Sequence, residues 1–169
     1  MLTRADRAAD LPKPPVWVLG TGECATHVHV SQMPDFARWD AAAVAARLAF
    51  DMAGVTHADI DVAEFYDAFT IVPVMGLEAA GFCAPGEGGA FVSGGRTAPG
   101  GAFPMNTNGG GLSYTHTGMY GMFTMVEAVR QLRGECGLRQ VEGAKTAICH
   151  GLGGMFSAAA TLICGTEHP

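Results

Sequence analysis

Apolar and polar positions alternate along the chain with two periods, one typical of strands and one typical of helices. Residues 16–19 form a continuous apolar run, which predicts a short buried strand that ends at Gly20 and Gly22. Residues 35–54 carry apolar side chains at four-residue spacing among alanines, which predicts the first helix, with Gly54 closing it. The members of this stripe are Val44, Leu48 and Met52.

Residues 59–66 alternate acidic and apolar side chains with a period of two, which predicts a strand with one polar edge. Asp67 follows directly and is placed to cap the next helix. The apolar positions of that helix are Phe69, Val72, Leu77 and Ala80. Because Pro73 lies inside this pattern, the helix either begins near Thr70 or is kinked at the proline.

A glycine-rich loop over residues 81–111 separates this part of the chain from a second clear helix after His116. The apolar stripe of that helix consists of Met119, Met122, Phe123, Val126 and Val129. Its methionines leave open a soft, adaptable binding face, but the spacing favours an ordinary stripe that packs into the core.

Two apolar runs, residues 145–150 and 156–164, are joined by a glycine turn at 151–154, which predicts an antiparallel hairpin. The order is therefore strand, helix, strand, helix, loop, helix, strand, strand. This order predicts an α/β fold with a mixed sheet, helices on its faces and a long glycine-rich loop.

Composition narrows the possibilities for the chain as a whole. Its 169 residues fit one domain over 15–169, preceded by a polar, proline-ending connector over 1–14. A net charge of −6 argues against nucleic acid as a partner. No apolar run reaches the length of a membrane span, and the polar first residues do not indicate a secretory leader.

The five cysteines are odd in number and show no C-x-x-C spacing, which argues against a disulfide framework and a zinc site. A reducing, cytoplasmic setting is therefore expected. His27 and His29 would share one face of a strand, but without a third ligand nearby they are interpreted as loop histidines rather than a metal site. Neither a metal nor a cofactor is expected.

Candidate chemistry concentrates in residues 104–121, where a glycine run precedes one histidine and two tyrosines. A flexible surface loop is the plain alternative, but proton-transfer side chains beside a helix start favour a ligand site. Strand-to-turn junctions, where α/β folds place their sites, would present Tyr66, His116 and Cys149. Each also has a structural interpretation, as a packing tyrosine, a lone histidine and a small buried hydrophobe.

Three motifs make this chain resemble the C-terminal half of a thiolase. Residues 64–69, Glu-Phe-Tyr-Asp-Ala-Phe, stand where thiolases have Asn-Glu-Ala-Phe. Asn108 and three glycines, followed by Thr115-His116, are similar to the glycine stretch and the Gly-His-Pro motif. Cys149-His-Gly resembles the Cys-x-Gly motif. The resemblance spans nearly the whole chain and is closest to the sterol-carrier and lipid-transfer branch.

The resemblance implies roles for individual residues. His116 would help activate the nucleophilic cysteine and bind the thioester oxygen, and Cys149 would act as acid and base at the α-carbon. The backbone that lines the acyl-CoA substrate would come from Asn108, Gly109, Gly110, Gly111 and Gly151. The nucleophilic cysteine of thiolases belongs to an N-terminal half that this chain lacks. An N-terminal half, or a second copy in a homodimer, would therefore cover the exposed face.

Departures from the motifs leave three hypotheses. Tyr66 replaces the asparagine, and Gly-His-Pro has become Thr115-His116-Thr117. Tyr66 and Tyr120 resemble the lipid-transfer retro-aldolases, which work with a small OB-fold partner. The chain is thus half of an acyl-CoA acyltransferase, a retro-aldolase of β-hydroxyacyl-CoA with a steroid-like side chain, or a non-catalytic scaffold that binds lipid. Activity in the first two cases requires the missing half.

Overall fold

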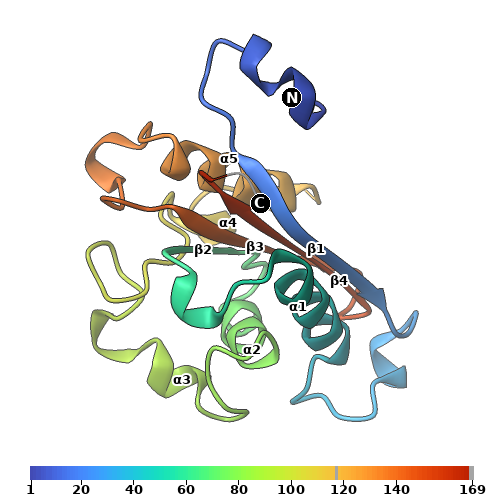
Figure 1. Ribbon diagram of the computed structural model, residues 1–169. Helices are drawn as coiled ribbons and strands as arrows, with labels where there is room; N and C mark the ends of the chain where they lie inside the picture. Colours follow the sequence, from blue (N-terminus) through green and yellow to red (C-terminus); the bar gives the residue numbers. More distant parts are fainter. Residues whose placement is uncertain (117, 168–169) are drawn as a thin grey trace.

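A computed structural model describes residues 1–116 and 118–167 and places a four-stranded sheet between two layers of helices (Figure 1). The strands are β1 (Trp17–Ala25), β2 (Val62–Phe65), β3 (Thr146–Gly153) and β4 (Ala158–Gly165). Their order across the sheet is β1-β4-β3-β2. β4 is antiparallel to both of its neighbours, whereas β2 and β3 are parallel. The predicted α/β class, the mixed sheet and the antiparallel final pair are confirmed.

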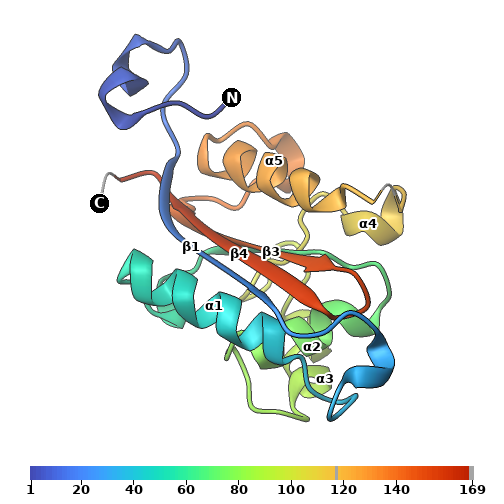
Figure 2. The same cartoon turned by 90° about the vertical axis from the view of Figure 1, so that its right-hand side faces the viewer.

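The helices divide between the two faces of the sheet (Figure 2). One face carries α1 (Asp40–Ala53), α2 (Ile71–Ala79) and α3 (Gly88–Phe91), and the other carries α4 (Gly110–Ser113) and α5 (Tyr120–Leu132). Short 3-10 turns are η1 (Ala5–Asp10), η2 (Val30–Gln32), η3 (His57–Asp59), η4 (Ser93–Gly95) and η5 (Gly137–Arg139). No helix in the described residues is long and apolar enough to cross a bilayer.

β1 does not stop at the glycines where the sequence predicted its end, but continues to Ala25. The two glycines serve instead as the contact surface for α1. A Cβ atom on Gly20 would overlap the carbonyl oxygen of Ala49, and one on Gly22 would overlap that of Ala45. The glycines therefore let the helix backbone lie directly on the strand, which is a packing role and not a turn.

The same close approach decides which face of α1 is buried. The helix begins at Asp40, later than predicted, and ends as expected at Gly54, which has a positive φ of 65°. Its buried face is formed by Ala41, Ala42, Ala45, Ala46, Ala49 and Phe50. The stripe predicted from the sequence lies elsewhere, with Leu48 39 % and Met52 63 % exposed. At Ala45 and Ala49, which face Gly22 and Gly20, the helix backbone lies so close to the strand that only a small side chain fits.

α5 likewise turns its predicted stripe away from the sheet. Its apolar side chains are exposed, Met119 at 70 %, Met122 at 57 %, Phe123 at 49 % and Val126 at 50 %. The buried face is instead partly polar and comprises Tyr120, Thr124, Glu127, Ala128, Gln131 and Leu132. The prediction of an ordinary core stripe is therefore wrong for this chain, because the sheet lies on the other side of the helix.

Two smaller expectations are resolved by the backbone. α2 begins at Ile71, so Pro73 occupies its first turn, where a proline removes no intrahelical hydrogen bond. The hairpin between β3 and β4 turns after Gly153 rather than at Gly151, so the glycines at the end of β3 lie within the sheet.

Substituting Gly20 tests the contact between β1 and α1. Gly20→Ala should lower the free energy of unfolding by about 1–3 kcal/mol, because the added methyl group has no space against the α1 backbone. Gly89→Ala, whose Cβ would meet no atom within 4 Å, is the control and should leave stability within about 0.5 kcal/mol. Urea unfolding of the protein as isolated measures both. Equal midpoints would contradict this account.

Candidate active site

A tyrosine cluster lies where β2 ends. The parallel register pairs Phe65 with His150, and the Tyr66 backbone N–H donates to the His150 carbonyl oxygen at 2.8 Å. From this position the Tyr66 hydroxyl lies 3.1 Å from Nδ1 of His116. The Tyr120 ring, at the start of α5, lies 5.5 Å from the Tyr66 ring between centroids. Three residues predicted from separate parts of the chain therefore meet at one sheet edge.

Burial sets the protonation of the two phenols. Tyr66 is 8 % and Tyr120 2 % exposed, whereas His116 is exposed. Removal from water raises the pKa of both hydroxyls above the ordinary value, and the nearby Asp67 carboxylate raises both further. Both tyrosines are thus neutral at physiological pH and available as hydrogen-bond donors.

The glycine turn is fixed against Asp67. This carboxylate accepts the backbone N–H groups of Gly111 at 2.6 Å and Leu112 at 3.3 Å. A Cβ atom on Gly110 would overlap the carboxylate, and one on Gly111 would lie 2.9 Å from its oxygen. Asp67 therefore does not cap α2, as the sequence suggested; it holds the loop that leads to His116.

Asn108 connects this turn to the phenol of Tyr120. Its Oδ1 atom accepts the Gly110 backbone N–H at 2.9 Å and the Tyr120 hydroxyl at 3.3 Å. Gly109 has a φ of 99°, which a residue with a side chain rarely adopts. Of the residues predicted to line the substrate, Asn108 and the glycine run thus lie beside the tyrosine cluster.

A groove of about 380 Å³ opens next to the cluster. It is lined by Asn108, Tyr114, Thr115, Tyr120, Phe123, Val126, Glu127, Arg130 and Arg139. Tyr120 and Asn108 contribute to it, so a ligand that enters the groove can reach both. Aromatic and aliphatic side chains of α5 make part of the wall, while Arg130 adds a positive charge and Arg139 is paired with Glu127.

Cys149 lies in β3, buried beneath α5. The sheet register pairs it with Glu64, two residues before Tyr66, and its thiol lies 3.7 Å from the Thr124 carbonyl oxygen beneath α5. Burial raises the pKa of the Cys149 thiol well above its ordinary value. The proposed proton shuttle would need the opposite shift. Gly151 is the residue of β3 that continues the same face past the end of β2.

The remaining sequence candidates make structural contacts. His27 hydrogen-bonds through Nε2 with the Met155 carbonyl oxygen at 3.1 Å and through Nδ1 with the Thr26 hydroxyl at 2.9 Å. Within residues 1–116 and 118–167, no group of three or more His, Cys, Asp or Glu side chains is arranged to hold a metal ion. Thr117, the last residue of the altered Gly-His-Pro motif, lies outside the described residues.

Comparison with known proteins agrees with this architecture. The family model described as "Thiolase C-terminal domain-like" matches residues 22–166. The chain belongs to this family. It is 38 % identical over 164 residues to an acetyl-CoA acetyltransferase of Methanothermobacter thermautotrophicus, covering 96 % of this chain and 43 % of that protein.

Two further relatives of this thiolase-like domain carry the names of lyases or aldolases. A 17-hydroxy-3-oxo-4-pregnene-20-carboxyl-CoA lyase of Mycobacterium tuberculosis is 33 % identical over 138 residues, covering 79 % of this chain and 35 % of that protein. The solved structure of an Ltp2-ChsH2(DUF35) aldolase superposes with a TM-score of 0.85 at 29 % identity, covering 98 % of this chain and 43 % of that one. The chain thus spans less than half the length of the relatives that it matches.

Sequence reasoning missed the residues that hold the thiolase-like site in place. The sequence predicts a helix cap for Asp67 and a polar edge for the strand that contains Glu64, whereas Asp67 holds the glycine turn and Glu64 is 1 % exposed. One signal pointed to the difference. A carboxylate inside an otherwise apolar strand is seldom buried without partners, so Glu64 indicates a polar network beneath the sheet surface.

The charge on Asp67 is testable through the tyrosines. Asp67→Asn should lower the pKa of Tyr66 and Tyr120, which remain above the ordinary value because burial is the larger cause. Since the chain has only three tyrosines, ultraviolet absorbance of tyrosinate against pH resolves the shift.

Asp61→Asn is the matched control for this titration. Asp61 accepts the backbone N–H groups of Lys145 at 2.8 Å and Thr146 at 2.9 Å, at the other end of β2. Its replacement also weakens two backbone hydrogen bonds but should leave the tyrosine titration as in the wild type. Identical curves for both variants would rule out the electrostatic role of Asp67.

Proposed function

We propose that this chain is the C-terminal half of a thiolase-like enzyme that cleaves a β-hydroxyacyl-CoA by a retro-aldol reaction. The cluster of Tyr66, His116 and Tyr120 is the observation that carries the proposal. Acyl transfer requires a thiolate nucleophile, whereas a retro-aldol step requires a base for the hydroxyl and a donor for the enolate. The Cys149 thiol is buried beneath α5, and burial raises its pKa well above the ordinary value, which favours the second chemistry.

The geometry suggests how protons move in this reaction. The Tyr66 oxygen takes the proton of the β-hydroxyl, while its own proton passes to Nδ1 of His116, 3.1 Å away. The electrons of the broken O–H bond form the new carbonyl, the bond between the α- and β-carbons breaks, and its electron pair becomes the thioester enolate. Because the pKa of Tyr66 is raised, the phenol acts as a relay and does not start as a phenolate.

Tyr120 completes the cycle as the acid. When substrate binds, its neutral hydroxyl turns from Asn108 to the enolate oxygen, which it stabilises, and then protonates the α-carbon. The proton held by His116 returns to the site through solvent, since this histidine is exposed. The scheme needs acyl-CoA as substrate and no further cofactor. The relatives named as a steroid-derived acyl-CoA lyase and an aldolase support a bulky lipid or steroid-like acyl group.

Acyl transfer is the second candidate, favoured by 38 % identity to an acetyl-CoA acetyltransferase. His116 would then polarise the thioester carbonyl, Cys149 would carry protons, and the nucleophile would come from another half. The two candidates differ in what Cys149 does, because only acyl transfer uses its thiol.

We also propose that a second α/β half covers the exposed face of α5. α5 packs on β2 and β3, and beside it a groove of about 610 Å³ extends over the rest of this sheet face. Met122, Phe123 and Val126 lie exposed next to it. This chain covers 43 % of the Ltp2-ChsH2(DUF35) aldolase chain, so the rest of such a relative is long enough to form a second half. A small partner protein is proposed by analogy with the same aldolase.

The tyrosine variants test the retro-aldol proposal in the assembled enzyme. Tyr66→Phe and Tyr120→Phe should each lower turnover of a steroid-like β-hydroxyacyl-CoA by about 10²-fold or more, because each removes one proton-transfer group. Tyr114→Phe, which changes an exposed tyrosine of the same groove, should retain wild-type turnover. Release of the carbonyl product measures all three.

Cys149→Ala separates the two candidates. Retro-aldol cleavage should continue near the wild-type rate in this variant, whereas thiolysis of a 3-oxoacyl-CoA would fall by about 10²-fold if acyl transfer were the true function. No turnover of either substrate by the assembled protein would leave the scaffold hypothesis as the correct one.

Introducing a charge on the exposed face of α5 tests whether this face is an interface. Phe123→Asp should prevent co-purification with the partner half, because the buried interface would then contain an unpaired carboxylate. Leu138→Asp, at a fully exposed site on η5, should leave the complex intact. Size-exclusion chromatography with light scattering measures the mass, and a wild-type mass for Phe123→Asp would refute this interface.

A further inference from the structure

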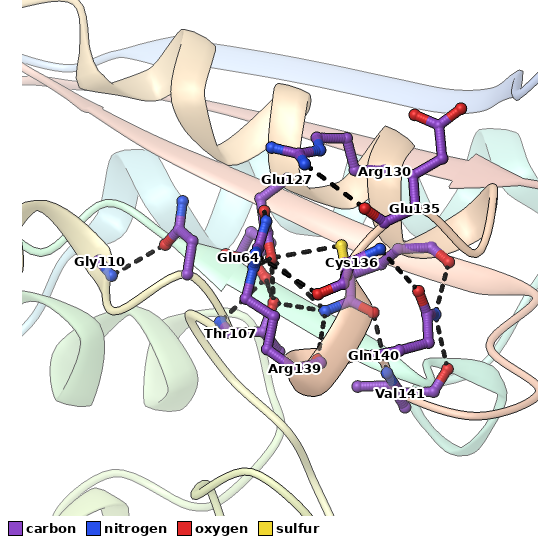
Figure 3. Close-up of polar contacts among 12 residues, drawn as sticks. Glu64, Thr107, Gly110, Glu127, Arg130, Glu135, Cys136, Arg139, Gln140 and Val141 are labelled. Carbon is purple, nitrogen blue, oxygen red and sulfur yellow. Dashed lines mark hydrogen bonds and ion pairs between the residues drawn. The ribbon is translucent and has the colours of Figure 1, made fainter.

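A buried polar network lies between β2 and α5 (Figure 3). It brings together two carboxylates from different elements, Glu64 of β2 at 1 % and Glu127 of α5 at 2 % exposure. The Thr107 hydroxyl bridges them, with its Oγ1 atom 2.9 Å from Glu64 Oε1 and 2.9 Å from Glu127 Oε1. None of these three residues belongs to the proposed reaction.

The Thr107 hydroxyl cannot donate to both carboxylates, since it carries one hydrogen. Gln131 Nε2 donates to the same oxygen at 2.8 Å, so one of its lone pairs is already used. If both carboxylates were ionised, the Thr107 oxygen would face one of the two carboxylate oxygens with no hydrogen between them. A single proton on one carboxylate satisfies every contact. The acid then donates to Thr107, which donates in turn to the other carboxylate.

The surrounding charges decide which carboxylate holds this proton. Arg139 forms two hydrogen bonds with Glu127, from Nε at 2.7 Å and from its terminal nitrogen at 3.0 Å. Burial alone would raise the pKa of Glu127, but the hydrogen bonds from Arg139 and Thr107 outweigh it and lower that pKa. Within residues 1–116 and 118–167, no Lys or Arg forms an ion pair with Glu64, so the proton belongs to Glu64.

The network continues to the tyrosine cluster through the backbone. The Thr107 N–H also donates to Glu64 Oε1 at 3.2 Å, so the backbone N–H and the side-chain hydroxyl of Thr107 both contact the same carboxyl group. The next residue is Asn108, which accepts the Tyr120 hydroxyl. We propose that Glu64 is a neutral carboxylic acid in the folded protein and that, through Thr107, it positions Asn108 and the phenol of Tyr120. Only the catalytic consequence rests on the proposed function.

The surroundings of Glu64 also favour its protonated form. Burial raises its pKa from 4.5 to about 8, and the carboxylates of Glu127 and Asp67 add to the rise, although the hydrogen bonds from Thr107 oppose it. Once it is ionised above its own pKa, Glu64 also raises the pKa of the Tyr120 phenol and of the Cys149 thiol. Arg139 is occupied by Glu127 and does not neutralise Glu64.

Infrared spectroscopy detects the proton directly. At neutral pH, the protein as isolated should show the carbonyl band of a protonated carboxylic acid, and Glu64→Gln should lack it. The same band in Glu64→Gln, or no such band in the wild type, would overturn the proposal. This measurement needs no enzymatic activity, so a failure of the proposed function does not affect it.

Unfolding against pH supplies a second activity-independent test. The pKa of Glu64 is higher in the folded than in the unfolded protein, so its contribution to stability is complete below pH 4.5 and is lost as pH rises to about 8. Across this window, the unfolding constant of the wild type should rise by up to about tenfold per pH unit relative to Glu64→Gln. Parallel curves for the two proteins would contradict a proton on Glu64.

Paired variants at Thr107 test the positioning role in the assembled enzyme. Thr107→Val keeps the shape but removes the hydroxyl, and should lower kcat about tenfold or more with KM unchanged, because Tyr120 loses its fixed position. Thr107→Ser keeps the hydroxyl and should restore kcat. An equal loss in both variants, or none in Thr107→Val, would exclude positioning through this hydroxyl. If the wild type shows no retro-aldol turnover, the absorbance titration of Tyr120 replaces kcat, and an unchanged curve in Thr107→Val has the same meaning.

Discussion

The site depends on one close pairing, in which residues 104–106 of the glycine-rich loop return alongside β2. The Ala63 N–H donates to the Pro104 carbonyl oxygen at 3.0 Å, and the Asn106 N–H donates to the Ala63 carbonyl oxygen at 2.9 Å. Asn106 then turns with a φ of 49°, and its side chain accepts the Phe65 N–H at 2.7 Å. This return places a second segment of the chain next to the strand that leads to Tyr66.

Glycine is required at position 110, where this returning segment passes Asp67 just after the end of β2. The Asp67 carboxylate occupies the space that a Cβ atom on Gly110 would need, and it holds the two N–H groups that follow. The glycine run is therefore a tightly held turn rather than a flexible loop, because its backbone donors are bound. His116 and Tyr120 reach the end of β2 as a consequence of this turn.

Electrostatics in the site arise from burial more than from ion pairs. Both phenols lose water, and both face the Asp67 carboxylate, so they remain neutral. In the network between β2 and α5, Arg139 neutralises one carboxylate and leaves the other to hold a proton. Neutral donors such as these two phenols suit the stabilisation of a developing negative charge.

The sequence by itself determined the class of fold, the order of the strands and helices along the chain, and the residues of the tyrosine cluster. Period-two and four-residue patterns reflect local backbone geometry, and motifs can be recognised from the spacing of their residues along the chain. It could not determine which face of a helix is buried, because α1 and α5 both turn their apolar stripes away from the sheet. Alanines facing strand glycines decide the first case, and a polar network facing β2 decides the second.

Only the tertiary structure showed that Cys149 is buried beneath α5 and assigned partners to Asp67, Glu64 and Thr107. The sheet register fixes how far each strand residue lies from the strand end, and register is a property of paired chains. The partners of the buried carboxylates come from residues about 40 positions away in the sequence. Contacts of that range depend on how the chain packs, and no local pattern encodes them.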